Sequence, residues 1–416
     1  MNFSHLANKL RSKITRFSGI LSQDLDKTAR RFVREAVYGI MASQSVMLTE
    51  IGRQLESTVS LKKTEERFSR QLKKPRLWTN IHSRVLSMAR SRIKEDTLLI
   101  LDLSDLKKKY AEKMEHMATV RDGSDRGELV NGYWTNQIIA AEVGSEQITP
   151  LHFSLYSQAS PEFSGENNQI IKAMDQVGTA LDNKGVWVID RGGDRDALYE
   201  SLLRNKRDFI VRLVGSRDFI YQDEKARSLW LAFACRSPYK RSFVRFIKGK
   251  EVQYNIRYGF VPVQLPDIHG LLNMVVVQGI SNKPMMLLTT LRITGEKDLW
   301  FVIQAYMKRW SVEETIRFIK QTYDLENIRV LKYTRLQNMM ALLLAVFFFI
   351  SVVLDQSQKL SIMAGHILKN AKRVFGIPDF KYYALGDGLF NIFSQFPGTL
   401  QNHQKLKQTQ LAFGFT

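Results

Sequence analysis

Residues 301–323, FVIQAYMKRWSVEETIRFIKQTY, place four different polar groups on one face of a predicted helix. These are a phenol, a guanidinium, a carboxylate and an ammonium group, on Tyr306, Arg309, Glu313 and Lys320. With about 100° of rotation per residue, the four side chains project within about 60° of one another. Apolar residues recur at helical spacing beside this face, so the same helix also docks on a core. One interpretation is a solvent-exposed ionic surface, because Glu and Lys stabilise helices through i,i+4 pairs.

Two apolar runs upstream end in an aspartate. The run TLLILDL at 97–103 carries Asp102 at its end, and VWVI is followed directly by Asp190. Short apolar runs with polar flanks predict buried strands. A carboxylate at the carboxyl end of such a strand lies where α/β sheets bind ligands. A single aspartate in this position is more often a turn or helix cap, and that alternative stays open for each of them.

Each of these aspartates has a rival nearby in the chain. Asp105 follows Asp102 by three residues, but Asp102 directly terminates the apolar run. Asp194 and Asp196 follow Asp190, and we predict that they form the N-cap and the first turn of the next helix. We therefore prefer Asp102 and Asp190.

The balance of charges favours a polyanionic partner. The 416 residues contain 61 Lys and Arg against 41 Asp and Glu, which gives a net charge of +20. Such a field suits nucleic acid. A basic protein without a nucleic-acid partner and a protein of anionic membrane surfaces are the alternatives. Residues 62–76, KKTEERFSRQLKKPR, form the most basic stretch, and we interpret them as a DNA-contacting helix rather than a solvated one.

Other classes of protein are disfavoured by the same sequence. A single cysteine excludes a disulfide framework, and the seven histidines form no zinc-binding pattern. No secretory signal is visible, and the longest apolar run, 339–350, falls short of the ~20 residues needed to cross a bilayer. We expect a cytoplasmic protein without a membrane segment.

The length predicts two or three domains. We expect an α/β protein with a helical N-terminal region at 1–95, a catalytic domain at 96–335 and a helical C-terminal region at 336–416. Within the catalytic domain, the predicted order is a three-stranded antiparallel meander, a helix, a strand, a helix and a strand. A β-rich insertion at about 215–298 follows, with a hairpin turn at Gly249, before the helix at 301–323.

Together these motifs resemble the bacterial insertion-sequence transposases with the YREK signature, which are cut-and-paste enzymes of the DDE type. The resemblance rests on LDLSDL around Asp102, VIDRGGD around Asp190, and the spacing of the helix at 301–323, and it covers roughly residues 97–335. It implies an RNase-H-like catalytic core, a mixed sheet flanked by helices, with the β insertion before its last catalytic helix.

The resemblance also implies a catalytic site. Asp102 would bridge two Mg²⁺ ions, Asp190 would bind one of them and Glu313 the other, and Mn²⁺ can replace Mg²⁺. Two such ions activate an attacking hydroxyl and stabilise a leaving oxygen at a phosphodiester. Mg²⁺ takes carboxylate, phosphate and water oxygens as ligands.

The remaining polar residues would bind DNA. By resemblance, Arg309 suits bidentate phosphate contact, and Tyr306 and Lys320 would contact the terminal phosphates. Arg212 in FIVRLV resembles a DNA-contacting arginine of the family; a surface charge at a strand edge is its alternative. The expected partners are the terminal inverted repeats, target DNA and a second copy of the chain in a synaptic dimer, with the apolar helix at 336–354 as a candidate interface. The expected location is the nucleoid.

Two alternatives remain open. A decayed, non-catalytic DNA-binding relic or repressor would share the fold, and so would a metal-dependent nuclease without strand transfer. The sequence departs from some members of the family in one place. The stretch KPMMLLTT at 283–290 lacks the tryptophan that those members use to hold a flipped base during hairpin excision.

Overall fold

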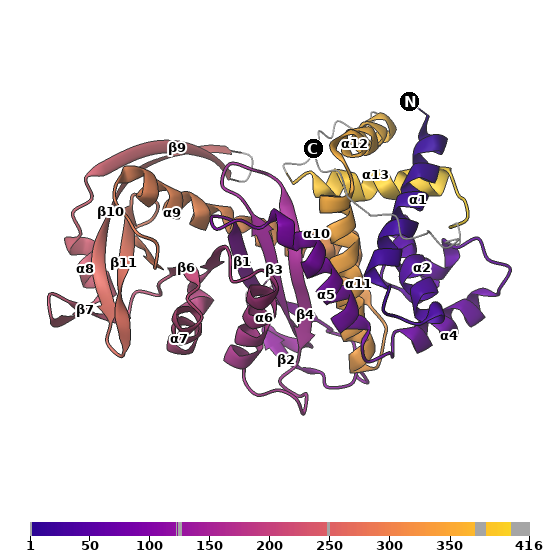
Figure 1. The fold of residues 1–416 in the computed structure, drawn as a ribbon, viewed down its shortest axis with the longest axis horizontal. Coiled ribbons are helices and arrows are strands. Elements are labelled where there is room, and N and C mark those ends of the chain that lie inside the picture. The colour runs from indigo at the N-terminus through magenta and orange to yellow at the C-terminus, as the bar shows by residue number, and fades with distance from the viewer. Residues whose placement is uncertain (1, 122, 124–126, 248–249, 371–379, 401–416) are drawn as a thin grey trace.

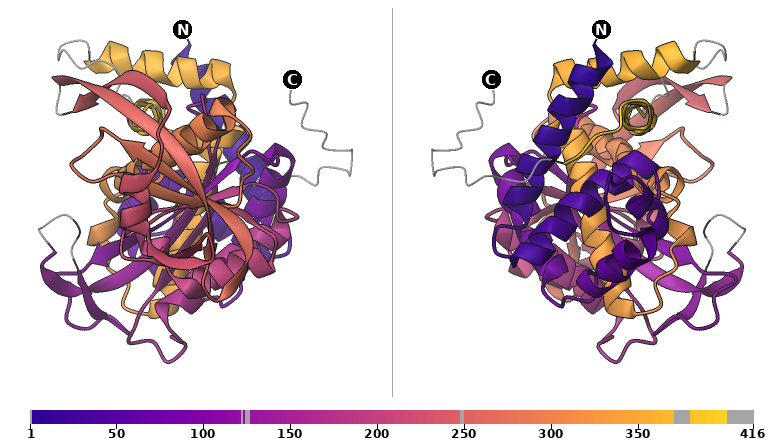
Figure 2. Two further views of the ribbon diagram at one scale, coloured as in Figure 1. Left: turned by 90° about the vertical axis from the view of Figure 1, so that its left-hand side faces the viewer. Right: turned by 90° about the vertical axis from the view of Figure 1, so that its right-hand side faces the viewer.

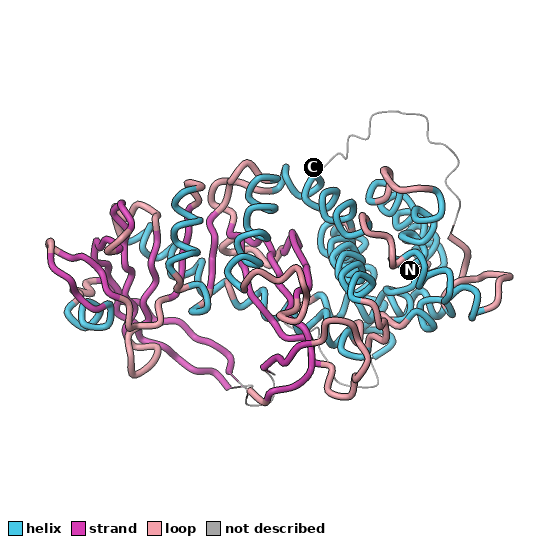
Figure 3. The backbone as a smooth tube through the Cα atoms, turned by 90° about the horizontal axis from the view of Figure 1, so that it is seen from below, coloured by secondary structure: helices cyan, strands magenta, loops and turns pink. Residues whose placement is uncertain are grey.

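The computed structural model describes residues 2–121, 123, 127–247, 250–370 and 380–400. One large sheet runs through the middle of the molecule, and helices from both ends of the chain gather on one side of it (Figure 1). Figure 3 separates a strand-rich half from a helical half. The candidate site lies in the central sheet, between these two halves.

The core of the sheet is built as predicted. Strands β1 (Leu98–Lys107), β3 (Leu129–Ala141) and β4 (Ile148–Tyr156) form the antiparallel meander. Strands β5 (Val186–Ile189) and β6 (Asp208–Arg212) then continue it in parallel with β1. The connection between β1 and β3 also contains a short strand, β2 (Ala118–Arg121), which the sequence pattern does not reveal because it is only four residues long and only partly buried.

The β insertion extends this sheet instead of forming a separate one. Its elements are β7 (Asp218–Tyr221), β8 (Glu224–Arg227), α8 (Ser228–Ala234), β9 (Tyr239–Ile247), β10 (Lys250–Leu265), β11 (Ile268–Gln278) and β12 (Met285–Thr289). Strand β12 pairs antiparallel with the core strand β6, with Leu288 opposite Val211. The strand order is therefore β2-β3-β1-β5-β6-β12-β11-β10-β7-β8. Strands β9 and β10 pair as a hairpin, but its predicted turn residue, Gly249, lies outside the described residues.

Helices cover the sheet and form the other half of the molecule. Within the α/β core lie α6 (Glu166–Ala180), α7 (Asp196–Arg204), α9 (Glu296–Lys308) and α10 (Trp310–Thr322). The N-terminal helices are α1 (Phe3–Leu21), α2 (Lys27–Ser43), α3 (Leu48–Arg53), α4 (Leu61–Gln71) and α5 (Leu77–Ala89). The C-terminal helices are α11 (Tyr333–Phe348), which continues as a π-helical turn (Phe349–Val353), α12 (Gln356–Asn370) and α13 (Tyr382–Gln395). Figure 2 shows the N-terminal helices against the C-terminal ones, and α2 packs on both α11 and α13.

The single helix predicted over 301–323 is wrong in one respect. Two helices, α9 and α10, meet at Arg309, and the first begins at Glu296. The Arg309 amide donates to the Tyr306 carbonyl at 3.1 Å, which is a tight i→i−3 turn instead of a regular helical bond. Helix α9 packs on β5 and β6, whereas α10 packs on β1 and β3. Neighbouring strands of a sheet are rotated relative to one another by the sheet twist. Two helical segments that pack on different strands therefore point in different directions, and the chain bends between them.

The apolar helix α11 is the buried centre of the helical half. Residues 333–353 form the one described helix that is long and apolar enough to cross a membrane, and nearly all of it is buried in the protein. Its one buried amide, Asn338, donates to the carbonyls of Leu72 and Lys74 and accepts from the Trp78 amide. These bonds fasten the connection between α4 and α5 to the centre of the protein.

A buried histidine pair joins α5 to the sheet. His152 Nδ1 lies 2.9 Å from His82 Nε2, and His152 Nε2 lies 2.8 Å from Ser154 Oγ. Burial lowers the pKa of His82 to about 4, and burial together with the neighbouring His82 holds the pKa of His152 well below its ordinary value. Both imidazoles are therefore neutral in the folded protein at neutral pH.

This pair predicts acid lability. Below pH 6.5 these histidines bind protons in the unfolded chain but not in the folded protein. The free energy of unfolding therefore falls between pH 6.5 and 4, by about 3 kcal/mol from His82 alone. Urea unfolding at pH 7.5 and pH 5 measures about 2 kcal/mol of this loss, and the rest follows at lower pH. The His82→Phe variant is expected to flatten the dependence, and replacing the exposed His5 by Gln is expected to leave it unchanged. An equal dependence in the His82→Phe variant and wild type would contradict the assignment.

Candidate active site

The two predicted aspartates lie side by side on parallel strands. Leu101 of β1 is paired in register with Ile189 of β5, so the next residue on each strand is Asp102 or Asp190. The Asp190 carboxylate accepts from the Gly192 amide at 2.7 Å, which starts the turn out of the sheet. Asp190 therefore follows the end of its strand as predicted, but β1 continues to Lys107, so Asp102 lies in the middle of its strand and not at its end.

Helix α10 brings the third carboxylate over this edge. It packs across β1 and β3 and carries Glu313 in its first turn. Glu313 forms an ion pair with Arg309, and Arg309 Nη1 also lies 3.6 Å from Asp102 Oδ2. The structure thus brings Asp102, Asp190 and Glu313 into one electrostatic cluster with a guanidinium among them.

The charge of this cluster is visible in one pKa. Burial first, and then the negative charges of Asp190 and Glu313, raise the pKa of Asp102 to about 7, against the opposing effect of Arg309. A carboxyl with a pKa near neutrality in a group of carboxylates marks a site with negative charge that the protein only partly compensates.

The rival aspartates have other partners. Asp105 forms an ion pair with Lys320 at 3.5 Å, and Lys320 is equally close to Glu326. The ammonium group of Lys320 thus pairs with two carboxylates in this structure, and its contact with a DNA end stays a prediction.

Asp194 is not the N-cap of the next helix, as we predicted. Arg195 occupies that position, and the Asp194 carboxylate instead accepts from the Val214 amide and pairs with Arg217. Arg217 also pairs with Asp196, which lies in the first turn of α7 as predicted. The buried Asp194 carboxylate therefore fastens the loop after β6, because two of its partners, the Val214 amide and Arg217, belong to that loop.

A phenol lies between two guanidinium groups at the junction of the insertion and the core. Arg212 Nη1 lies 3.4 Å from the Tyr306 hydroxyl oxygen. The guanidinium carbons of Arg212 and Arg309 lie 5.8 and 5.7 Å from the centre of the Tyr306 ring. Arg212, Tyr306 and Arg309 therefore form a continuous basic strip that leads to the carboxylates, and such a strip suits a phosphate backbone.

Sequence analysis missed Gln137. This residue of β3 is paired with Asp102 across the sheet and is buried, and neither the Oε1 nor the Nε2 atom of its amide has a hydrogen-bond partner among the residues that the structure describes. Directly opposite residues of an antiparallel pair project from the same face. The polar run TNQ inside an otherwise apolar strand was the signal that could have identified it.

The three side chains of the cluster are of the type that binds divalent cations, but their positions in this structure do not converge on one ion. Three carboxylates, one within β1, one just after β5 and one on α10, offer the oxygen ligands that Mg²⁺ prefers. Among the residues that the structure describes, however, no three His, Cys, Asp or Glu side chains are placed to hold a metal ion together. The Arg309 guanidinium occupies the charge-compensating position instead.

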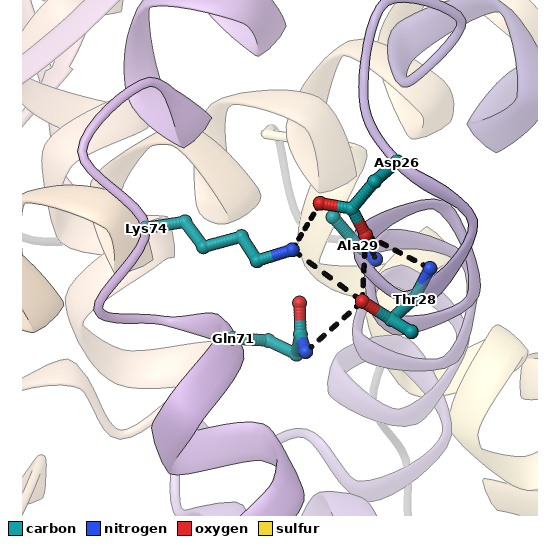
Figure 4. Close-up of polar contacts among 5 residues, drawn as sticks. All are labelled: Asp26, Thr28, Ala29, Gln71 and Lys74. Carbon is teal, nitrogen blue, oxygen red and sulfur yellow. Dashed lines mark hydrogen bonds and ion pairs between the residues drawn. The ribbon is translucent and has the colours of Figure 1, made fainter.

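The predicted basic helix exists as α4, but it ends at Gln71, four residues before Pro75. Only Thr64 and Phe68 of this helix are buried, while Lys62, Lys63 and Arg70 are exposed. Figure 4 shows how its end is held: Lys74 pairs with Asp26, and Gln71 donates to the Thr28 hydroxyl. Asp26 in turn caps α2 by accepting from the Thr28 and Ala29 amides. The exposed cations are thus presented by a helix that is fixed at its end.

The strand order, with an antiparallel meander followed by two parallel strands and helices on the sheet, is that of an RNase-H-like domain. Residues 94–349, more than half of the chain, match the family model of the transposase DDE domain. The chain belongs to this family of transposases. A search of curated proteins found no significant match.

Proposed function

We propose that this transposase binds the terminal inverted repeats of a bacterial insertion sequence, cleaves the DNA at those ends and transfers the 3′ ends to target DNA. The observation that carries the proposal is the cluster of Asp102, Asp190 and Glu313, with the raised pKa of Asp102 as its electrostatic signature. The spacing of Tyr306 and its neighbours supports membership of the YREK group.

The three carboxylates would hold two Mg²⁺ ions. When bound, such ions activate a water or 3′-hydroxyl and stabilise the leaving oxygen of the phosphodiester. Asp102 would be the central ligand of the site, because the charges of both Asp190 and Glu313 act on its carboxyl. Ionised carboxylates are needed for this, so protons compete with metal at Asp102 near pH 7.

The protein's own basic groups would position the DNA. Arg212 and Arg309, on either side of Tyr306, would contact the phosphates of the cleaved strand. Helix α4 would contact the terminal repeat through its exposed Lys and Arg residues. Two ends must be held together for transposition, so a synaptic dimer acting at the nucleoid completes the proposal. Because α11 is covered by other helices, a dimer interface along it would need those helices to move.

The test uses purified protein and a plasmid that carries the native DNA on both sides of the gene. We expect double-strand breaks at the element ends with Mg²⁺ or Mn²⁺, none with EDTA, and joining of the 3′ ends to a second plasmid. A plasmid with scrambled ends is the matched control. Cleavage that survives EDTA would contradict metal catalysis.

Two other functions predict different results in the same assay. A relic or repressor would bind the ends and cut nothing. A nuclease would cut with Mg²⁺ and never join 3′ ends to target DNA. The presence of all three carboxylates in one cluster favours an active enzyme over a relic.

A further inference from the structure

Arg309 lies where it blocks the carboxylates from any other cation. Its guanidinium pairs with Glu313 and lies 3.6 Å from Asp102, and its side chain is only 11% exposed. The two carboxylates that it joins come from different elements, β1 and α10. A guanidinium and a divalent cation that share the same oxygens repel each other strongly at such distances, particularly away from water.

The backbone at Arg309 can accommodate a change of position. Arg309 ends α9 and begins α10, through the tight turn that its amide makes with Tyr306 and the bond from the Val312 amide to the Arg309 carbonyl. Residues that absorb such changes typically lie at the ends of elements. The Arg309 side chain can also donate one more hydrogen bond, because its buried Nε has no hydrogen-bond partner among the described residues.

A DNA phosphate offers Arg309 a better partner. Arginine binds phosphate through two parallel hydrogen bonds. In the structure, the two Nη groups of Arg309 are directed to two different carboxylates, Nη1 to Asp102 and Nη2 to Glu313. Arg212 and Tyr306, which lie next to Arg309, extend the basic strip along which a phosphate backbone would approach.

We propose that Arg309 keeps Asp102 and Glu313 from binding a cation until a DNA phosphate draws its guanidinium away, so that DNA binding and metal binding strengthen each other. This inference rests on the proposed function and adds a regulation to the same site. The coupling is reciprocal: DNA raises the affinity for metal by the same factor as metal raises the affinity for DNA. The benefit is that the DNA-free enzyme stays without metal and is inactive.

Isothermal titration of Mn²⁺ into the full-length, DNA-free protein tests the first half of the proposal. We expect Arg309→Gln to bind Mn²⁺ about 10-fold more tightly than wild type. Arg317→Gln is the matched control, since Arg317 lies on the same helix and pairs with Glu314 instead. The gain is expected to vanish in the double variant Asp102→Asn/Arg309→Gln, which shows that the added ion sits in this site.

Titration with a short end-sequence duplex tests the second half, after subtraction of the Mn²⁺ that the duplex binds in complex with Asp102→Asn. We expect the duplex to raise the Mn²⁺ affinity of wild type about 10-fold and to leave that of Arg309→Gln unchanged. Equal Mn²⁺ affinities of DNA-free wild type and Arg309→Gln would overturn the proposal. If that occurs while wild type still cleaves element ends, the proposed function stands; if neither protein binds Mn²⁺ or cleaves, the proposed function fails.

Discussion

The Asp102→Asn variant is expected to lose DNA cleavage by about a thousandfold or more and, at the same time, to become more stable at pH 8. The loss follows because the neutral amide of Asn is a poorer ligand for a divalent cation than the carboxylate that the proposed function assigns to metal binding. The gain follows from the raised pKa of Asp102, about 7 in the folded protein against about 4 in the unfolded chain. Between these two values the folded protein holds a proton that the unfolded chain releases, so the free energy of unfolding falls as the pH rises.

Above pH 7, ionised Asp102 lowers the free energy of unfolding by up to about 4 kcal/mol, and Asn at this position has no such effect because it does not ionise. Urea unfolding of wild type and variant at pH 8 and pH 5, without metal, measures the difference, which is expected to shrink at pH 5. Asp105→Asn is the matched control, and it is expected to bring no such gain, because its carboxylate pairs with Lys320. A variant that cleaves normally would show that another residue is the first ligand.

The Glu313→Gln variant is expected to lose cleavage by about a thousandfold while it binds element ends at least as tightly as wild type. Glu313 pairs with Arg309, so its loss frees a guanidinium for phosphate, and the exposed cations of α4 are on another part of the protein. Rates of strand cleavage with Mg²⁺, and a gel-shift titration with end DNA in EDTA, measure the two properties separately.

Glu314→Gln provides the control for that variant, since the neighbouring carboxylate pairs with Arg317 and not with Arg309. We expect it to cleave at the wild-type rate. Equal activity of Glu313→Gln and wild type would mean that the third carboxylate is elsewhere. Loss of both cleavage and end binding would indicate that the variant is misfolded, and a thermal melt identifies that case.

The sequence predicted the elements of the fold because the core of this sheet is strongly patterned. The apolar runs around Leu101 and Ile189 have the length and polar flanks of buried strands, and the first residue after each apolar run is an aspartate. The mixed α/β class with helical regions at both ends is confirmed. The assignment of catalytic and DNA-binding roles remains a prediction.

Other features could not be read from the sequence because they depend on contacts between distant segments. The break at Arg309 comes from two helix segments that follow different strands, and nothing in the local sequence stops the helix there. Asp194 looked like a helix cap until β6 placed the Val214 amide beside it. Gln137 became conspicuous only when the strand register set it opposite Asp102.

The pairing of β6 with β12 means that the insertion is not an accessory that evolution or a protein engineer can simply excise. Removing residues 215–290 would make β6 an exposed edge strand. The backbone amides and carbonyls that pair with β12 would be unpaired, and β6 is two strands away from the strand that carries Asp102. The same pairing places Arg212, at the end of β6, opposite Leu287. A displacement of the insertion, for example by a DNA duplex bound to it, would therefore be transmitted to the carboxylates through the paired strands β12, β6, β5 and β1. In the part of the chain that the structure describes, no flexible linker separates the insertion from these strands.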